Sequence, residues 1–139
     1  MTPEEKQVFL ADVHVGVVSV ADGDRGPLTV PIWYDYEPGG DVIFITGRNS
    51  RKGRLMAKAG RMSLVAQTET APYKYVTVEG PCTLKSADRE RDLRPMARRY
   101  LGEKGGDAYI ATMAGGDGAD SVLVRLRPEH WPRPPVLRR

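Results

Sequence analysis

The chain has 139 residues, of which 40% are hydrophobic and 28% charged, a balance that is typical of a folded protein and excludes a disordered or fibrous one. This length fits a single domain, residues 1–139, with a sizeable core. The net charge of +3 is mild, and no basic stripe with interleaved aromatic residues is evident, so the sequence does not indicate a nucleic-acid partner.

The sequence also bears on the compartment of the protein. No apolar run approaches the length of a membrane span, and the N-terminus lacks the basic-then-apolar form of a signal peptide, so we expect no membrane association. Cys82 is the single cysteine, which excludes an intramolecular disulfide and fits a reducing cytoplasm, the expected location. With one cysteine and two histidines, a zinc site is not expected.

The first third of the chain predicts a short helix followed by three strands. Thr2 and Glu5 form a capping box around Pro3, so a helix is expected to reach about Asp12. Three runs rich in β-branched residues follow, separated by turns that contain glycine. They cover residues 13–21, 28–36 and 41–46. The short connections predict a meander, in which consecutive strands pair antiparallel.

The third strand leads into a basic helix start. After Thr46, a glycine turn and a cap at Ser50 or the preceding asparagine begin a helix that runs to about Lys58. Two hydroxyls and the cations of Arg51 and Lys52 therefore gather at a helix N-terminus. Its exposed N–H groups and helix dipole favour an anion there, and phosphate is the simplest one. A solvated basic helix start is the alternative interpretation.

The rest of the chain predicts three further strands with helices between the last two. The strands cover residues 62–67, 75–85 and 121–127. In the fifth strand, Gly80-Pro81 predicts a bulge or bend, as at a barrel corner, and Cys82 lies on the apolar face. The proline-rich segment after residue 127 is expected on a surface or on a partner chain. Six strands with short turns predict a mainly β protein, a small barrel with helical decorations.

Helical spacing appears over residues 87–101, and a second short helix is expected over 107–114. Pro95 must interrupt or kink the first helix, or begin another one capped by Asp92. The expected apolar stripe is Leu93, Met96, Ala97, Tyr100 and Leu101. We interpret the arginines of this segment as a solvated face. They are Arg89, Arg91, Arg94, Arg98 and Arg99.

No self-sufficient catalytic apparatus is evident. His14 lies among valines in a strand and is interpreted as structural, while His130 belongs to an irregular segment. We therefore assign no catalytic side chain and expect any reactivity to come from a cofactor. Pro31 within a strand predicts an edge, where free backbone groups can meet a planar heterocycle, and Gln67 ends an apolar strand with a neutral amide.

Taken together, the ordered motifs VPIW, FIT, NSRK, SLVAQ and YVTVEG resemble the split-barrel flavoproteins of the pyridoxamine 5'-phosphate oxidase-like superfamily. The flavin and deazaflavin oxidoreductase branch is the most similar. The resemblance covers roughly residues 13–84 and implies a six-stranded split β-barrel of the FMN-binding type. It also implies a homodimer with FMN, or the deazaflavin coenzyme F-420, bound at the interface.

The resemblance assigns cofactor-binding residues by their place in these motifs. Residues of VPIW would line the isoalloxazine ring, and the end of FIT would touch the ring and its side chain. The Ser-Arg-Lys element would bind phosphate, and Gln67 would reach the cofactor across the dimer interface. The complete expected set is Val30, Pro31, Ile32, Trp33, Ile45, Thr46, Ser50, Arg51, Lys52 and Gln67.

The implied function is a flavin- or deazaflavin-dependent oxidoreductase that transfers a hydride to or from a small, unsaturated substrate. Pyridoxamine 5'-phosphate oxidation is an alternative, but Thr29 and Ile32 stand where vitamin B6 oxidases carry positively charged residues. The arginine-rich segment could also receive the polyglutamate tail of the deazaflavin coenzyme. A non-catalytic flavin-binding or sensing module is the second hypothesis, and a basic structural protein without cofactor is the third.

Overall fold

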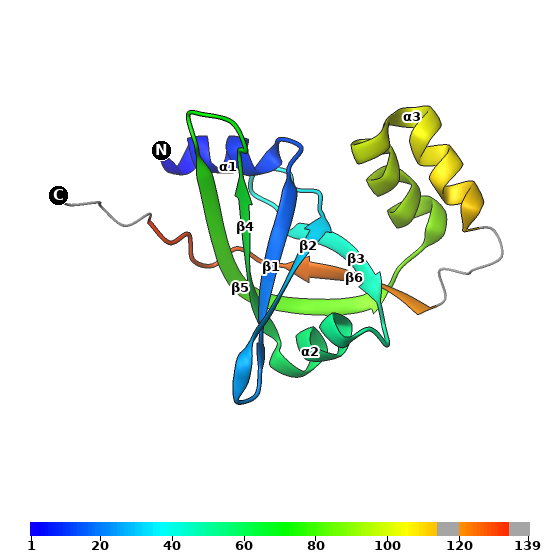
Figure 1. Ribbon diagram of the computed structural model, residues 1–139, viewed down its shortest axis with the longest axis horizontal. Coiled ribbons are helices and arrows are strands. Elements are labelled where there is room, and N and C mark those ends of the chain that lie inside the picture. Colours follow the sequence, from blue (N-terminus) through cyan, green and yellow to red (C-terminus); the bar gives the residue numbers. More distant parts are fainter. Residues whose placement is uncertain (114–119, 134–139) are drawn as a thin grey trace.

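The computed structural model describes residues 1–113 and 120–133, which form six strands and the helices around them (Figure 1). The strands are β1 Val15–Asp22, β2 Arg25–Trp33, β3 Val42–Gly47, β4 Arg61–Gln67, β5 Tyr75–Ser86 and β6 Ser121–Leu126. The helical segments are α1 Pro3–Ala11, α2 Arg51–Ala59, the π-helical turn η1 Arg89–Leu93 and α3 Arg94–Thr112. The predicted mainly β fold is confirmed. None of these helices combines the length and the apolarity that a membrane span requires.

Local sequence sets the ends of the first two helices as expected. The Thr2 hydroxyl accepts a hydrogen bond from the Glu5 amide, and the Glu5 carboxylate accepts one from the Thr2 amide, both at 3.1 Å. Ser50 caps α2 by accepting from the Gly53 amide at 3.1 Å. The same helix ends at Gly60, whose φ of 68° lies in the left-handed region that glycine adopts without strain.

The strands pair antiparallel throughout, but in the order β2-β1-β4-β5-β6-β3 rather than as a meander. The prediction that the second and third strands pair was wrong, because β3 pairs with β6 along its whole length. Residues 34–41 carry the chain away from β2. Within the described residues, this segment pairs with β3 only through an isolated antiparallel bridge between Asp35 and Ile43. Among the described residues, β2 and β3 are therefore the two edge strands of the sheet, and they face each other across the split of the barrel.

Strand β5 forms the corner of the barrel. Residues 75–81 pair with β4, whereas residues 82–86 pair with β6, and Figure 1 shows the strand curving between these two partners. Gly80 lies at the bend, where a Cβ atom would overlap the carbonyl oxygen of Arg127. The register with β4 is unbroken through Pro81. The predicted corner is thus confirmed as a bend, not a bulge.

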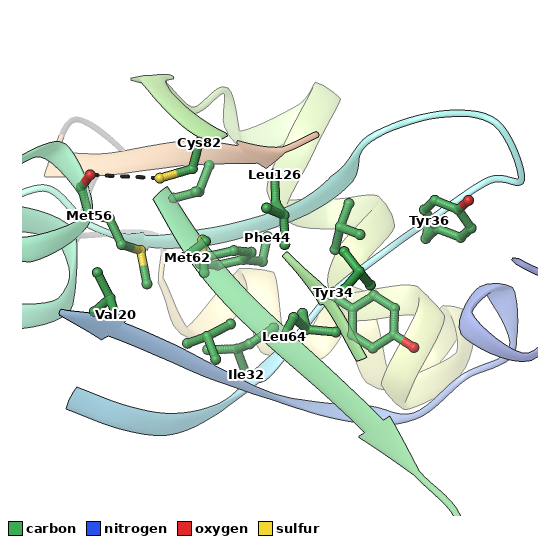
Figure 2. Close-up of a cluster of buried hydrophobic side chains, with 14 of the residues drawn as sticks. Val20, Ile32, Tyr34, Tyr36, Phe44, Met56, Met62, Leu64, Cys82 and Leu126 are labelled. Atoms are coloured by element: carbon green, nitrogen blue, oxygen red, sulfur yellow. Dashed lines mark hydrogen bonds between the residues drawn. The ribbon is translucent and has the colours of Figure 1, made fainter. Parts of the chain in front are cut away.

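The inner face of the barrel is filled with apolar side chains from every strand and from α2 (Figure 2). Phe44, Met56 and Leu126 are fully buried at its centre. Tyr34 is also buried, and its hydroxyl donates to the carbonyl of Leu10 at 2.7 Å. Cys82 belongs to this core, as expected, and burial raises the pKa of its thiol. Hydrophobic burial therefore holds the barrel together.

Helix α3 folds back on itself as a helical hairpin, defined here as residues 89–112, which stands beside the barrel near the end of β3 (Figure 1). Gly102, with a φ of 77°, breaks the helix, whereas Pro95 begins α3 after η1, which is the second of the two alternatives predicted for it. Gly106 packs on the backbone of Arg98, where a Cβ would lie 2.6 Å from the amide nitrogen. Leu101 is 44% exposed, so its place in the predicted apolar stripe was wrong. The helix predicted over residues 107–114 forms the second arm of the hairpin as far as Thr112, and residue 114, where it was expected to end, lies outside the described chain.

The start of the hairpin differs from the prediction in its cap. The Asp88 carboxylate, and not that of Asp92, caps the first turn by accepting from the Arg91 amide at 2.7 Å. Asp92 bonds back to the Asp88 amide at 2.7 Å. Pro95 falls in the first turn of α3, where a missing N–H costs nothing.

The interpretation of the arginines as a solvated face was wrong for most of them. Arg94 and Arg98 both bind the carboxylate of Asp107 on the return arm, at 2.7 and 2.8 Å. Arg89 donates to the Ile110 carbonyl at 2.9 Å, which joins the two arms again. Hydrophobic spacing could not predict these contacts, because the partners are a carboxylate and a backbone carbonyl on the other arm of the hairpin. Arg91 does remain exposed.

The two histidines have structural surroundings. The His14 ring stacks on Phe9 at 4.5 Å and bonds its carbonyl at 3.0 Å, which confirms the structural interpretation. His130 forms a bridge to Glu79 of β5, so the segment after β6 lies along its own barrel as far as the description reaches. Trp131 packs on the core and meets Tyr36 edge-on at 6.2 Å.

Candidate functional site

A cavity of about 460 Å³ lies between the split of the barrel and the helical hairpin. This size falls in the range of small-molecule and cofactor sites. Its walls are mostly apolar, and they come from the start of β1, from the edge strands β2 and β3, from α2 and from both arms of the hairpin. The lining residues are Val15, Pro31, Ile32, Trp33, Ile45, Lys52, Leu93, Met96, Ala97 and Tyr109.

The strand wall comes from the residues that the VPIW and FIT motifs place at the edges. Pro31 pairs with Val17 on one side of β2, and the other side of the strand is a free edge, as a proline requires. Ile32 and Trp33 continue this wall, and Ile45 faces it from β3. Four of the ring-lining residues expected from sequence are thus brought together. Val30 is not among the lining residues; it is half-buried and packs on the barrel core.

The turn between β3 and α2 holds its two hydroxyls together. Thr46 is only 5% exposed, and its hydroxyl lies 3.3 Å from that of Ser50. Ser50 in turn donates to the Gly47 carbonyl at 2.7 Å while it caps the Gly53 amide. A Cβ at Gly53 would overlap the Gly47 carbonyl, so glycine is required for this tight turn. The hydroxyls are therefore preorganised by the turn itself.

The two cations of the basic helix start point to different places. Lys52 lines the cavity. Arg51 instead forms an ion pair with Asp22, at the turn between β1 and β2. A third cation, Arg48 in the turn before α2, donates to the Ser86 hydroxyl at the end of β5 at 2.8 Å. The structure therefore separates Arg51 and Lys52, which sequence reasoning had treated as one element.

Gln67 lies outside the cavity of its own chain. It is exposed at the end of β4, opposite Tyr75 of β5. Its expected contact with a cofactor across a dimer interface stays a prediction.

Sequence reasoning missed the helical wall, defined by Leu93, Met96, Ala97 and Tyr109. Helical spacing had identified the first three of these residues, but only as a stripe for packing. Leu93 and Ala97 do pack against Trp33 and Ile45 in a second apolar cluster. The cavity therefore lies directly beside this small core, and the apolar stripe serves both.

Arg99 joins the hairpin to the barrel through several polar contacts. Its guanidinium donates to the carbonyls of Tyr34 at 3.0 Å, Ala11 at 2.9 Å and Asp12 at 3.2 Å. It also pairs with the Asp35 carboxylate at 3.2 Å. These groups lie at the end of α1 and just after β2, so one side chain fastens the helical wall to two parts of the barrel.

Comparisons with known proteins identify the fold. A sequence profile of pyridoxamine 5'-phosphate oxidase matches residues 2–132. No curated protein matches the chain. An F-420 reductase structure has a TM-score of 0.74 at 18% identity, covering 91% of this chain and 94% of that one. An FAD-binding protein from Mesorhizobium loti has a TM-score of 0.66 at 16% identity, covering 94% and 92%. A conserved hypothetical protein from Mycobacterium tuberculosis has a TM-score of 0.74 at 19% identity, covering 94% of this chain and 82% of that one.

At such identities the solved structures show a shared fold, while the profile covers nearly the whole chain. Together they agree with six antiparallel strands that curl into a barrel split between β2 and β3. The family resemblance predicted from the sequence is confirmed. The chain belongs to the pyridoxamine 5'-phosphate oxidase family of split-barrel flavoproteins.

Proposed function

We propose that this protein binds FMN or the deazaflavin coenzyme F-420 in the cavity and acts as an oxidoreductase on a small, unsaturated substrate. The observation that carries the proposal is the cavity itself. It opens at the split of the barrel, its walls are apolar, and Lys52 is the one cation that lines it in the described part of the chain. The F-420 reductase and the FAD-binding protein of the same fold support a ligand of this ring type.

The walls suit a planar heterocycle. Pro31, Ile32 and Trp33 from β2 and Ile45 from β3 would contact the ring, and Val30 would support this strand from inside the barrel. The outer edge of β2 has no strand partner in the described chain, so its backbone groups can meet ring heteroatoms. Apolar walls with a few polar groups are typical of cofactor sites.

The turn into α2 suits a phosphate group. Lys52 would bind it by charge-assisted hydrogen bonds, worth about 1.5–3 kcal/mol. The first turn of α2 adds backbone N–H groups and the positive end of its dipole. Thr46 would add a neutral hydrogen bond, whereas Ser50 would have to redirect the proton that its hydroxyl donates to the Gly47 carbonyl. Arg51 would contribute less than its neighbour, because Asp22 already holds its guanidinium.

We also propose a homodimer that completes the site. Exposed apolar side chains gather where β1 begins and β5 begins, including Val15 at 51% and Tyr75 at 39% exposure, with Val13 and Tyr73 close by in sequence. Gln67 ends β4 at the same end of the sheet. Burial of this surface by a second copy would bring Gln67 to the cofactor of that copy. An exposed apolar patch of this kind favours a protein interface.

The chemistry of such a site would come from the cofactor, which accepts or donates a hydride when it is bound. We assign no catalytic acid or base, because the lining residues are apolar apart from Lys52 and the phenol of Tyr109. The protein itself would bind the phosphate, orient the ring against Trp33 and Ile45, and exclude water from the cavity beneath the helical wall.

Titration of the purified protein with FMN and with the deazaflavin coenzyme tests this proposal. Saturable binding of one of them, followed by absorbance, is expected at micromolar concentration. Turnover is then assayed with the reduced cofactor and unsaturated substrates, and with pyridoxamine 5'-phosphate as a separate substrate. Binding without any turnover would favour the non-catalytic flavin-binding module. Failure to bind either cofactor would contradict both functions.

A further inference from the structure

The phenol of Tyr100, on the hairpin, is hydrogen-bonded to two segments of the barrel that lie next to the cavity. The Tyr100 hydroxyl accepts a hydrogen bond from the Tyr34 amide at 3.0 Å. Its own proton can go to the His14 carbonyl at 2.5 Å or to the Tyr34 carbonyl at 2.9 Å. Burial raises the pKa of this phenol, so it remains a neutral donor and acceptor. The hydroxyl thus binds two segments that are far apart in sequence.

The backbone groups that Tyr100 binds belong to residues next in sequence to residues that line the cavity. Tyr34 follows Trp33, and His14 precedes Val15, and both neighbours line the cavity. Because strand residues alternate in direction, the Tyr34 side chain fills the barrel core (Figure 2), while the neighbouring Trp33 packs against the apolar cluster of the hairpin. The backbone at Tyr34 therefore fixes the base of the Trp33 side chain.

The Tyr100 ring fixes the other end of the same side chain. It stacks on the Trp33 indole with centroids 5.0 Å apart and planes only 5° from parallel. The Tyr109 ring also contacts the indole, with centroids 5.7 Å apart and planes tilted by 53°. The Arg99 guanidinium lies 5.9 Å from the Tyr100 ring centroid, so the phenol itself is held in place.

We infer that Tyr100 is a positioning residue of the cavity: its hydroxyl fixes the chain beside Trp33 and Val15, and its ring holds the Trp33 indole in the orientation that lines the site. Tyr100 is not itself a lining residue. It acts through Trp33, and this role rests on the proposed function of the cavity as the cofactor site. Nothing in the sequence motifs singles it out.

The test uses the full chain labelled with fluorotryptophan, which contains two tryptophans, Trp33 and Trp131. Fluorine NMR then reports on each indole separately, and a Trp131→Phe variant assigns the signals. In Tyr100→Phe the ring remains and the hydroxyl is lost. We expect the Trp33 resonance to shift and broaden, the Trp131 resonance to stay, and the Kd for the bound cofactor to rise roughly tenfold as the competent orientation becomes less populated.

Tyr36→Phe is the matched control. Its hydroxyl is also part-buried and hydrogen-bonded, to Gln7 and to the Gly39 amide, but it lies on the Trp131 side of the core. This variant is expected to leave the Trp33 resonance unchanged. A folded Tyr100→Phe protein with the wild-type Trp33 resonance and the wild-type Kd would overturn the inference.

Two further outcomes are informative. If Tyr100→Phe does not fold, Tyr100→His keeps a ring against Trp33 and a nitrogen that can accept from the Tyr34 amide, and the same two readouts apply to it. If wild-type protein binds neither FMN nor the deazaflavin coenzyme, the proposed function fails. The Trp33 resonance would then decide alone whether Tyr100 orients the indole.

Discussion

The two walls of the cavity rest on different interactions. The strand wall, Pro31–Trp33 and Ile45, belongs to a barrel whose interior is closely packed and apolar. The helical wall belongs to a hairpin that is held by arginines, carboxylates and backbone carbonyls. Hydrophobic burial is not screened by salt, whereas the exposed ion pairs within the hairpin, such as Arg98–Asp107, are weak and are screened by it. The hairpin should therefore open locally before the barrel unfolds.

This difference bears on how the site could work. A rigid strand wall can hold the ring and phosphate of a cofactor in one place. A separately fastened helical wall can change without loss of the barrel, because the small cluster of Leu93, Ala97 and Ile110 is the main apolar contact beneath it. Substrate preference is then expected to follow the hairpin, and cofactor binding to follow the strands.

The largest expected effect is on the barrel side, in Gly80→Ala. The added methyl group would overlap the Arg127 carbonyl at the corner of β5, which is backbone and cannot move aside cheaply. The free energy of unfolding should fall by about 3 kcal/mol or more, as measured by urea denaturation. Gly26→Ala is the control, because the space around that position is open. An unchanged midpoint for Gly80→Ala would show that the corner is more plastic than the packing indicates.

The hairpin side is tested by Arg99→Ala. This change removes three hydrogen bonds from a cation to carbonyls and the ion pair to Asp35, worth roughly 2–4 kcal/mol together. Hydrogen exchange should accelerate in residues 94–112 and stay slow in the strands. Arg91→Ala is the matched control, because that side chain is 63% exposed and bonds only to its neighbour Asp92 in the described chain. Equal acceleration in hairpin and barrel would contradict the separation of the two regions.

A smaller effect is expected from the two cations at the start of α2. Lys52→Ala should raise the Kd for the cofactor about tenfold, because one charge-assisted phosphate contact is lost. Arg51→Ala should weaken binding less, since its guanidinium is already paired with Asp22. Isothermal titration gives both constants, and Arg54→Ala on the same helix is the control. A larger loss for Arg51 than for Lys52 would mean that Asp22 releases the arginine when the cofactor binds.

Most local structure could be predicted from the sequence, because its causes are local. The Thr2–Glu5 capping box, the Ser50 cap, the corner at Gly80 and the edge position of Pro31 each depend on residues close in the chain. The core position of Cys82 followed from alternation along one strand. The family motifs added the order of the strands that line the cavity, which alternation alone does not give.

The parts that could not be predicted depend on partners distant in sequence. The pairing of β3 with β6 is decided by which edges the whole sheet leaves free. Arg99 binds carbonyls at residues 11, 12 and 34, and no side-chain pattern marks those carbonyls as unpaired. The different roles of Arg51 and Lys52 depend on Asp22, which only the fold brings near α2.

The smallest expected effect is a pH dependence confined to the hairpin. Arg98 and then Arg94 hold the pKa of the Asp107 carboxyl below its usual value, and Arg94 does the same for Glu90. A depressed folded-state pKa contributes stability above the unfolded-state value and loses it as pH falls through the folded-state value. Protection of the hairpin amides should therefore be constant from neutral pH to about pH 5 and decline below about pH 4, while the strands keep theirs.

This effect is small because both carboxylates are exposed to solvent, where ion pairs contribute little. Hydrogen exchange at several pH values, corrected for the intrinsic rate at each, measures it. In Asp107→Asn, the hairpin amides should already be less protected from exchange at neutral pH, and their protection should change much less as the pH is lowered. Glu103→Gln on the same helix, whose carboxylate forms no ion pair within the described chain, should behave as wild type. A decline of equal size in hairpin and strands would mean that acid acts on the barrel, and the two regions would then share one cooperative unit.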